Sequence, residues 1–506
     1  MKKSKIWAFF LVLALFLCEK PPSARAAQPE PIATGAAFLG EITTGTTLYA
    51  FDADARYAPD SLTKIMTLLL CAEAYEKGAV NLQTKITASD TSWFDITTEY
   101  ASLGIMPGES MTFVDLIHCA YVGGSMSACN VLAEHIGGGV GYFVEMMNER
   151  AAELTCRGTH FVNPSGIAHD DQYTTARDMF LITREAVSHE LFLQVARVTR
   201  YTALKTNLSL ARTFTSVNFI LQPANTRYYY EYAVAGQAGG ANGTHSCVEY
   251  AARDGLETIV VILGASSPIQ SDRSVQMTGL IDARRLLAWG SETYGWRAVL
   301  SASANLESIP VAYGKDTDSV ALRPERDVTL LLENEVPDSA IGYETLLYAR
   351  ENGEALAAPV RMGDVLGEVA LTLDGREIAR VKLVAESSVP MLRLRFFEDQ
   401  LGRALGHGVG LYLLLALAAL LLLYAAMVLR YGARRRQERE LVESMKRQII
   451  EERRNGEYHR GYASDTRGAP RENAPGWRSP EAAEMAEDDL DEDDLDEDDT
   501  DEDDTE

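Results

Sequence analysis

Residues 56–67 read Arg-Tyr-Ala-Pro-Asp-Ser-Leu-Thr-Lys-Ile-Met-Thr, and the run Ile65–Ala74 is apolar on nearly all sides. Such a run predicts a helix that is buried all round. Ser61 and Lys64 fall in its first turn, and the i, i+3 spacing places both side chains on one face. A neutral, desolvated lysine can take the proton of a serine hydroxyl and activate it. Ser61 is therefore a candidate nucleophile and Lys64 its general base, although a capping serine followed by a surface lysine gives the same pattern.

The chain around this helix mixes strand-like apolar runs with helical stretches, which is typical of an α/β domain. Thr258–Leu263 is a continuous β-branched run that ends at Gly264, and it predicts a buried central strand. We expect residues 28–296 to form one α/β domain that contains Ser61.

A small β domain is predicted for residues 297–390. Val369–Leu373 and Ile378–Val384 flank Asp374-Gly375, and an Asp-Gly pair between two such runs is a strong signal for a β-hairpin. Apolar and basic residues alternate in the second run, so that strand should have one buried and one solvated face.

The first 26 residues carry the pattern of a secretory signal peptide. Met-Lys-Lys-Ser-Lys is followed by the uncharged run Ile6–Cys18 and by Ala24-Arg25-Ala26, a small-x-small cleavage site. Thirteen residues are too few to cross about 30 Å of hydrocarbon as a helix. The mature chain is therefore expected to start near Ala27 or Gln28.

Residues 408–429 form a 22-residue run without a charge, which predicts one transmembrane helix. A buried helix of a globular core would have the same composition, but no globular domain that could bury these residues is predicted after them. Arg430 and Arg434–Arg436 follow directly, so the positive-inside rule places residues 430–506 in the cytoplasm. The signal peptide independently places the preceding domains outside.

The net charge of −26 is concentrated at the C-terminus, where residues 487–506 hold 16 Asp or Glu and no Lys or Arg. The rest of the chain therefore carries only −10, which gives no reason to expect nucleic-acid binding. Residues 434–454 predict a basic helix that is solvated or lies on the membrane surface, although its apolar stripe could pair with another helix. Beyond Asn455 the composition predicts a disordered acidic tail with no identifiable partner.

Five cysteines remain once Cys18 in the leader is set aside, and no CxxC pair occurs. A zinc ribbon or a thioredoxin-like redox pair is therefore not indicated. We expect these five cysteines to be free and buried, because a domain of this size needs no disulfides.

The block 56–67 resembles the active-serine segment of the low-molecular-mass penicillin-binding proteins, the serine D-alanyl-D-alanine carboxypeptidases of peptidase family S11. Further matching blocks follow in the family's order and cover roughly 350 residues together with the β region: Gly104–Leu116, Val131–Gly138, Asn163–Ile167, Tyr173–Asp178, Thr258–Ala265 and Asp282–Trp289. The resemblance implies a penicillin-binding-protein/β-lactamase-like transpeptidase domain followed by the small β domain.

Two of the family's motifs are degenerate here. The second, usually Ser-x-Asn, falls on Gly124-Ser125-Met126. A one-residue shift would let Ser125 or Ser127 stand in, with Ser125 as a possible proton relay, although two loop serines that cap the following helix give the same pattern. The third, Lys-Thr-Gly, falls on Gln237-Ala238-Gly239, which leaves Gln237 and Gly239 as candidate substrate-binding residues. The missing lysine would normally hold the substrate carboxylate and lower the pKa of Lys64 by charge repulsion.

The resemblance implies a serine-type D-Ala-D-Ala carboxypeptidase that cleaves peptidoglycan stem peptides through an acyl-enzyme on Ser61. It implies β-lactams as covalent inhibitors and no metal or organic cofactor. The degenerate motifs predict low activity, and they leave open a non-catalytic pseudoenzyme that binds cell-wall peptide or partners and anchors them at the membrane. A β-lactamase is a weaker alternative, since such enzymes usually lack the β domain and the membrane helix.

The predicted topology is open to a direct test. External protease added to intact cells should remove the serine domain and spare an epitope in the acidic tail, because the tail is expected in the cytoplasm. If external protease digests the tail epitope, the predicted orientation is wrong.

Overall fold

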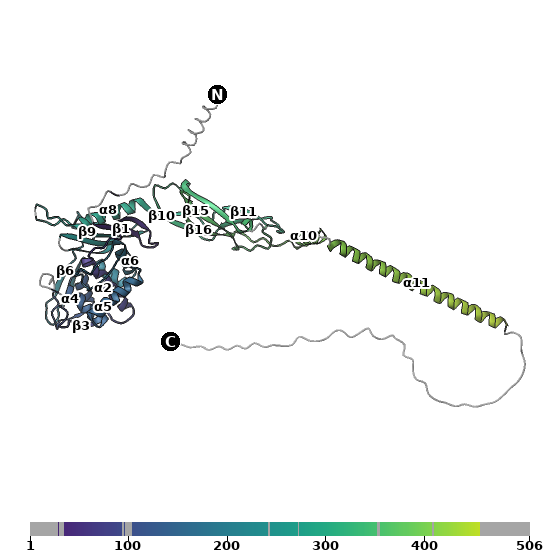
Figure 1. The fold of residues 1–506 in the computed structure, drawn as a ribbon, viewed down its shortest axis with the longest axis horizontal. Coiled ribbons are helices and arrows are strands. Elements are labelled where there is room, and N and C mark those ends of the chain that lie inside the picture. The colour runs from purple at the N-terminus through teal and green to yellow at the C-terminus, as the bar shows by residue number, and fades with distance from the viewer. Residues whose placement is uncertain are drawn as a thin grey trace, which may run out of the picture. The chain divides into compact units, whose positions relative to one another are not determined.

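The computed structural model describes residues 29, 35–93, 96, 104–240, 243–271, 273–351, 355–406 and 409–455. The predicted signal peptide and the chain beyond residue 455 lie outside these residues. Figure 1 shows the order of the elements along the chain.

The serine domain is built on a five-stranded antiparallel sheet. Its strand order is β2-β1-β9-β8-β7. The strands are β1 (Ala36–Glu41), β2 (Thr47–Phe51), β7 (Ala233–Gly239), β8 (Thr244–Arg253) and β9 (Leu256–Ser266). The predicted strand Thr258–Leu263 is confirmed as the buried centre of β9, because both faces of the sheet are covered.

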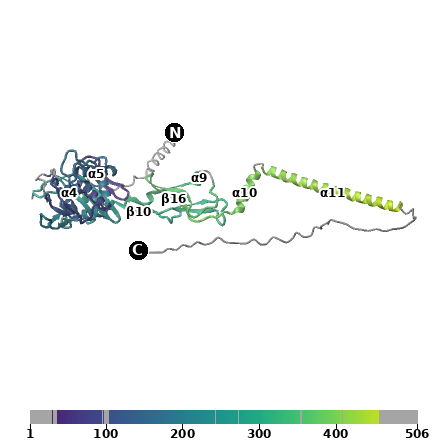
Figure 2. The ribbon, with the colours of Figure 1, turned by 90° about the horizontal axis from the view of Figure 1, so that it is seen from below.

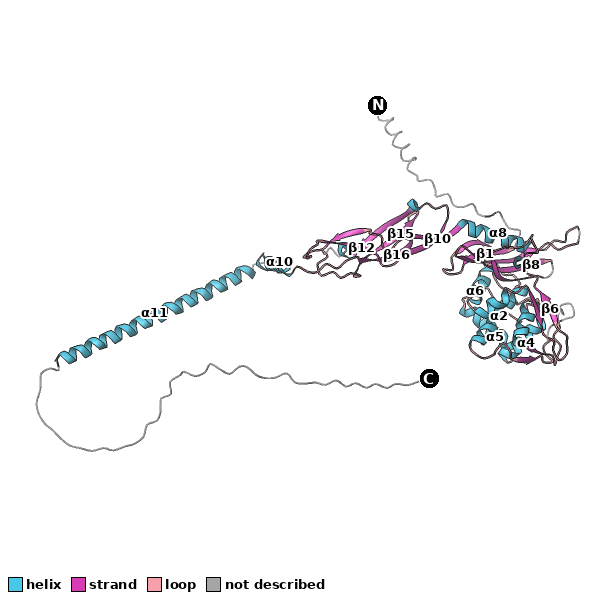
Figure 3. Ribbon diagram, turned by 180° about the vertical axis from the view of Figure 1, so that it is seen from behind, coloured by secondary structure: helices cyan, strands magenta, loops and turns pink. Residues whose placement is uncertain are grey.

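One face of the sheet packs against α8 (Thr278–Thr293) and the other against a group of helices that includes α2 (Thr63–Glu76) and α6 (Ala176–Ala186) (Figures 1 and 3). The helix α2 contacts five other helices and is buried at 11 of its 14 positions, as the all-round apolar run predicted. Its remaining neighbours are α3 (Phe113–Tyr121), α4 (Met126–Gly137), α5 (Val140–Glu153) and α7 (Glu190–Ala196).

Short elements connect this helical group to the sheet. They are the 3-10 turns η1 (Asp60–Leu62) and η2 (Phe219–Leu221) and the hairpin of β5 (Arg200–Ala203) with β6 (Arg212–Thr215). A separate strand pair, β3 (Lys85–Thr87) with β4 (Ser110–Thr112), lies between α2 and α3. The turn η1 runs directly into α2 and packs against β7 and β8. The fold thus places Ser61 between the central helix and an edge of the sheet.

The chain continues from α8 into β structure. A five-stranded sheet has the order β11-β12-β16-β15-β14, and β10 (Tyr294–Leu300) pairs with β13 (Val328–Glu333). Figure 2 labels β10 and β16 of this β structure. The other elements are β11 (Glu307–Pro310), β12 (Ser319–Pro324), η3 (Asp338–Ala340), β14 (Ile341–Leu347), α9 (Tyr348–Glu351), β15 (Val365–Leu373) and β16 (Arg376–Ala385). The predicted hairpin is confirmed: Asp374 and Gly375 both have positive φ, as a two-residue turn between these strands requires.

Two helices close the described chain, α10 (Arg393–Gly406) and α11 (Val409–Asn455). Among the described residues one helix, Gly410–Gln448, is long and apolar enough to cross a membrane, by length and composition alone. It contains most of the predicted 408–429 span.

The five cysteines beyond the leader are free and buried, as predicted: Cys71, Cys119, Cys129, Cys156 and Cys247. Burial raises the pKa of Cys71 and Cys119 above the usual range of a thiol, so these side chains act as small apolar groups in the core.

Candidate active site

Ser61 lies in η1 and Lys64 in the first turn of α2, so both stand at the junction of these two elements. Asp60, the residue before the serine, has a φ of 47°, and this left-handed conformation turns the chain sharply into the helix. Lys64 is only 2% exposed, and its Nζ donates a hydrogen bond of 2.5 Å to the carbonyl oxygen of Ser165. The alternative of a solvated surface lysine is therefore wrong.

The burial of Lys64 decides its protonation. Loss of hydration lowers the pKa of the Lys64 amine, and this effect outweighs the opposing influence of Cys129 and Asp60, which raise it. The absence of a third-motif lysine led us to expect an amine that stays protonated to higher pH. Desolvation lowers the pKa of Lys64 whether or not a second cation is present, so that expectation stays a prediction.

A tight turn at Asn163–Ile167 forms one wall beside the serine. The Asn163 side-chain oxygen accepts hydrogen bonds from the backbone N–H of Ser165, Gly166 and Ile167, at 3.2, 2.8 and 3.1 Å. Gly166 has a φ of 84°, and a Cβ atom there would collide with the carbonyl of Asp60. This Asn-Pro-Ser-Gly turn therefore fits against η1 only with glycine, and it carries the carbonyl that binds Lys64.

The strand β7 forms the opposite wall. Gly239 lies directly against Ser61, because a Cβ atom at this position would collide with the serine Oγ. Ala238 points to the other face and packs in the core under α8. The third-motif alignment thus puts a glycine where the backbone must approach the nucleophile closely.

Gln237 lies two residues earlier in β7 and is 4% exposed. Its Nε2 donates to the carbonyl of Tyr121 at 3.1 Å, and its Oε1 accepts from the backbone N–H of Ala238 at 3.0 Å. Both ends of the side-chain amide are therefore bound within the protein. The structure positions Gln237 as a link between β7 and the end of α3.

Ser125 is fully buried at the N-cap of α4, where its Oγ accepts a hydrogen bond from the backbone N–H of Ala128 at 3.3 Å. Its hydroxyl lies 3.3 Å from that of Ser127, which in turn accepts from the backbone N–H of Ile105 at 3.1 Å. These contacts are structural ones, since they cap a helix and hold a neighbouring loop. A proton-relay role for Ser125 stays a prediction.

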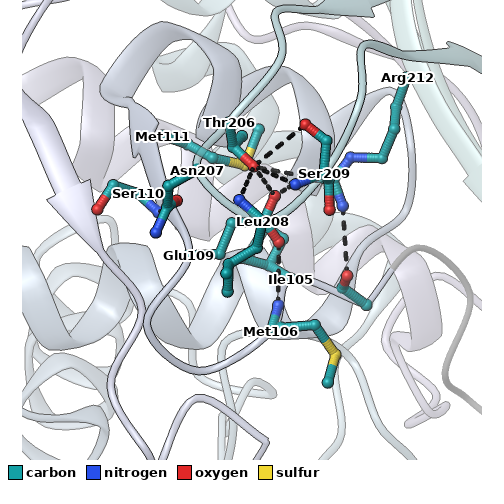
Figure 4. A network of polar contacts seen from close by, with 12 residues as sticks. Ile105, Met106, Glu109, Ser110, Met111, Thr206, Asn207, Leu208, Ser209 and Arg212 are labelled. Atoms are coloured by element: carbon teal, nitrogen blue, oxygen red, sulfur yellow. Dashed lines mark hydrogen bonds and ion pairs between the residues drawn. The ribbon is translucent and has the colours of Figure 1, made fainter.

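The loop that contains Ile105 is held by the β5–β6 hairpin (Figure 4). Glu109 is fully buried and pairs with the Arg212 guanidinium at 2.5 Å, while the hydroxyl of Thr206 donates to the same carboxylate at 2.8 Å. Asn207 adds hydrogen bonds to Gly108 and Ser110, both at 2.8 Å. This network attaches the segment that precedes α3, and whose Ile105 bonds to α4, to the β5–β6 hairpin about 100 residues later in the chain.

A second buried carboxyl lies behind β7. Glu249 in β8 is fully buried, and Asn218 donates a hydrogen bond to its Oε2 at 2.9 Å. The same oxygen lies so close to Gly236 that a Cβ atom there would collide with it. Burial raises the pKa of Glu249 well above its usual value and so favours the neutral carboxyl. Neither Glu249 nor Asn218 was singled out from the sequence.

Three side chains outside this region, Glu73, Glu185 and His189, could in principle surround a metal ion. The guanidinium of Arg150 already pairs with both carboxylates, at 2.7 Å to Glu73. The protein's own cation therefore neutralises this cluster, and we assign no metal to it.

A central helix that starts with Ser-x-x-Lys, set against the edge of a helix-covered antiparallel sheet, defines the penicillin-binding-protein class of fold. The fold is similar to the crystal structure of penicillin binding protein 5 from Haemophilus influenzae, with a TM-score of 0.54 and 24% identity over 72% of this chain and 100% of that one. It is also similar to the D-alanyl-D-alanine carboxypeptidase DacD from Francisella tularensis, with a TM-score of 0.56 and 21% identity over 75% of this chain and 98% of that one.

The chain belongs to the D-alanyl-D-alanine carboxypeptidase family, whose model matches residues 23–267, and the model of the penicillin-binding protein 5 C-terminal domain matches residues 294–391. The carboxypeptidase DacF of Bacillus subtilis is 27% identical over 360 residues, which cover 70% of this chain and 85% of that protein. DacA of Haemophilus influenzae is 25% identical over 388 residues, 75% of this chain and 91% of that protein. The predicted family and fold class are confirmed, and the relatives support a role in peptidoglycan metabolism.

The Glu109–Arg212 pair should be essential for stability. Glu109→Ala leaves the Arg212 charge largely buried without its partner, and it should lower the free energy of unfolding by about 3–5 kcal/mol. As a control, Asp54→Ala removes the exposed pair of Asp54 with Arg177, at 2.7 Å, and should cost about 0–1 kcal/mol. Urea unfolding of both variants provides the comparison, and equal losses would contradict this account.

Glu249 should make stability fall with rising pH. Its pKa is raised in the folded state, so above about pH 4.5 the unfolded chain loses a proton that the folded chain keeps. Each further pH unit then costs about 1.4 kcal/mol until the folded carboxyl titrates. Glu249→Gln removes this cost, and its advantage in urea midpoint over the wild type should grow as the pH rises above about 4.5. The exposed Glu145→Gln should show no such trend, and a constant Glu249→Gln difference would mean that the buried carboxyl is ionised throughout.

Proposed function

We propose that the protein is a serine-type D-Ala-D-Ala carboxypeptidase of low activity, which acts on peptidoglycan stem peptides through an acyl-enzyme on Ser61. The observation that carries this proposal is the buried Lys64, whose amine lies one helical turn from the serine and has a lowered pKa. A neutral amine at this position can accept the Ser61 proton.

The acylation step uses these two side chains. Ser61 Oγ attacks the carbonyl carbon of the D-Ala-D-Ala bond, and its proton passes to Lys64 Nζ. The C–N bond then breaks, the leaving amine takes the proton, and D-alanine departs. Water hydrolyses the resulting ester and restores the serine. No step needs a metal or an organic cofactor.

The oxyanion of the tetrahedral intermediate needs hydrogen-bond donors near Ser61. The backbone N–H of Ser61 lies at the start of a helical turn and would contribute one. The close approach of Gly239 supports this assignment, since it brings the backbone of β7 to the nucleophile without a side chain in between.

The proposed place of action is the outer face of the cell membrane. The helix Gly410–Gln448 supports anchoring by a single pass. The serine domain (28–296) and the β domain (297–390) would then be extracytoplasmic, and residues 430–506 would be cytoplasmic, with no partner assigned to the acidic tail.

A pseudoenzyme is the second candidate, and the inward-turned Gln237 favours it. The hydrogen bonds of Gln237 and the capping role of Ser125 mean that neither degenerate motif offers the site a charged group. Such a protein would bind cell-wall peptide or a partner without turnover. The two candidates differ in whether Ser61 can be acylated.

Incubation with a β-lactam therefore distinguishes the carboxypeptidase from the pseudoenzyme. Benzylpenicillin at millimolar concentration should add its mass to the chain at Ser61, because opening of the strained lactam needs only the nucleophile and its base. Peptide mapping by mass spectrometry should locate the adduct, and Ser61→Ala should abolish it. The rate of labelling should rise with pH as Lys64 loses its proton. Complete absence of the adduct in folded protein would establish the pseudoenzyme.

A further inference from the structure

The strand β7, whose Gly239 lies against Ser61, is held within the sheet from one side. In the described part of the chain β7 is the last strand of the sheet, and its strand partner there is β8. An edge strand is less restrained than a central one, because pairing fixes it on one side only. The distance between β7 and the nucleophile therefore depends on contacts from outside the sheet.

Tyr121, the last residue of α3, supplies two such contacts. Its hydroxyl donates a hydrogen bond to the carbonyl of Gly236 at 3.3 Å, and its own carbonyl accepts one from the Gln237 side chain at 3.1 Å. The Gln237 amide oxygen in turn accepts from the backbone N–H of Ala238 at 3.0 Å. Two successive residues of β7 are thus bound to one residue of α3, and the same amide holds the third.

Tyr121 is itself firmly held. It is buried, and its ring packs edge-on against Phe192 of α7 with 5.8 Å between the ring centroids. It also lines a small cavity together with Lys64. Burial and the nearby Glu249 carboxyl raise the pKa of the Tyr121 hydroxyl, so this group keeps its proton and remains a hydrogen-bond donor. The residue therefore connects the surroundings of the base to the strand beside the nucleophile.

From these contacts we propose that Tyr121 is a positioning residue for the reaction at Ser61. It holds β7 at the distance from the nucleophile at which an acyl donor can lie along the strand. Extended ligands bind a strand edge through main-chain hydrogen bonds, so a displaced strand would misalign the bond that Ser61 attacks. This proposal rests on the proposed acylation of Ser61 and adds to it a residue that acts through β7.

Tyr121→Phe tests this role, because it removes the hydroxyl and keeps both the ring and the backbone carbonyl. The second-order rate of Ser61 acylation by benzylpenicillin should fall by about 2- to 12-fold, the range that one neutral hydrogen bond supports. Hydrogen–deuterium exchange in peptides that cover residues 233–239 should become faster. The pH at which the labelling rate is half-maximal should not move, because Lys64 keeps its hydrogen bond to Ser165.

Tyr201→Phe is the matched control. The Tyr201 hydroxyl donates to Asp115 of α3 at 2.7 Å, so this variant also removes a tyrosine hydrogen bond to α3 but leaves both bonds between Tyr121 and β7 in place. Urea unfolding measures the stability that each variant loses. The control should keep the wild-type rates of labelling and of exchange in residues 233–239. Gln237→Leu removes the other bond to Tyr121 and should also speed this exchange.

Equal labelling rates in the wild type and Tyr121→Phe would overturn the proposal, while the proposed acylation of Ser61 would stand. A fall in rate that Tyr201→Phe shares at the same loss of stability would overturn it too, since the effect would then be one of stability alone. A shifted pH midpoint would mean that Tyr121 acts through Lys64 and would also contradict the proposal. If benzylpenicillin does not modify Ser61 in the wild type, the proposed function fails and this proposal fails with it.

Discussion

The chemistry proposed for this chain depends on the desolvation of one amine. Lys64 sits in the first turn of a helix that is buried on all sides, and the cost of keeping a charge there favours its neutral form. The carbonyl of Ser165 accepts a hydrogen bond from this amine, and Gly166 fits the same turn against the residue before the nucleophile. The core packing around α2 therefore also lowers the pKa of the amine that is proposed as the base for Ser61.

Under the proposed function, this arrangement would leave a reactive centre although two motifs are degenerate. In a site where a second cation lowers the pKa of the lysine, removal of that cation would also remove the base. Here burial lowers the pKa of Lys64, and Gln237 links β7 to Tyr121.

Much of the fold could be predicted, because its signals are local. The buried run Ile65–Ala74, the strand Thr258–Leu263 and the Asp374-Gly375 hairpin each follow from a few neighbouring residues. The pairing of Ser61 with Lys64 was predictable for the same reason, since both belong to one helical turn.

The rest of the site depends on contacts between distant residues. The partner of Gln237 is 116 positions away, that of Lys64 is 101 away, and Glu109 reaches Arg212 across 103. No local pattern shows that an amide will turn inward or that a carboxyl will be buried. The Asn-Pro-Ser-Gly turn could have been recognised as a rigid wall from its composition, because asparagine and glycine at this spacing favour a tight turn.

The most direct test of the central claim is the titration of Lys64 itself. NMR of protein labelled with ¹³C at its lysine side chains, with the resonance assigned by its loss in Lys64→Met, reports the pKa of this amine. The account predicts a value well below the ordinary lysine pKa of about 10.4. A Lys64 that titrates at or above that value would show that burial does not lower its pKa, and it would contradict the proposed mechanism.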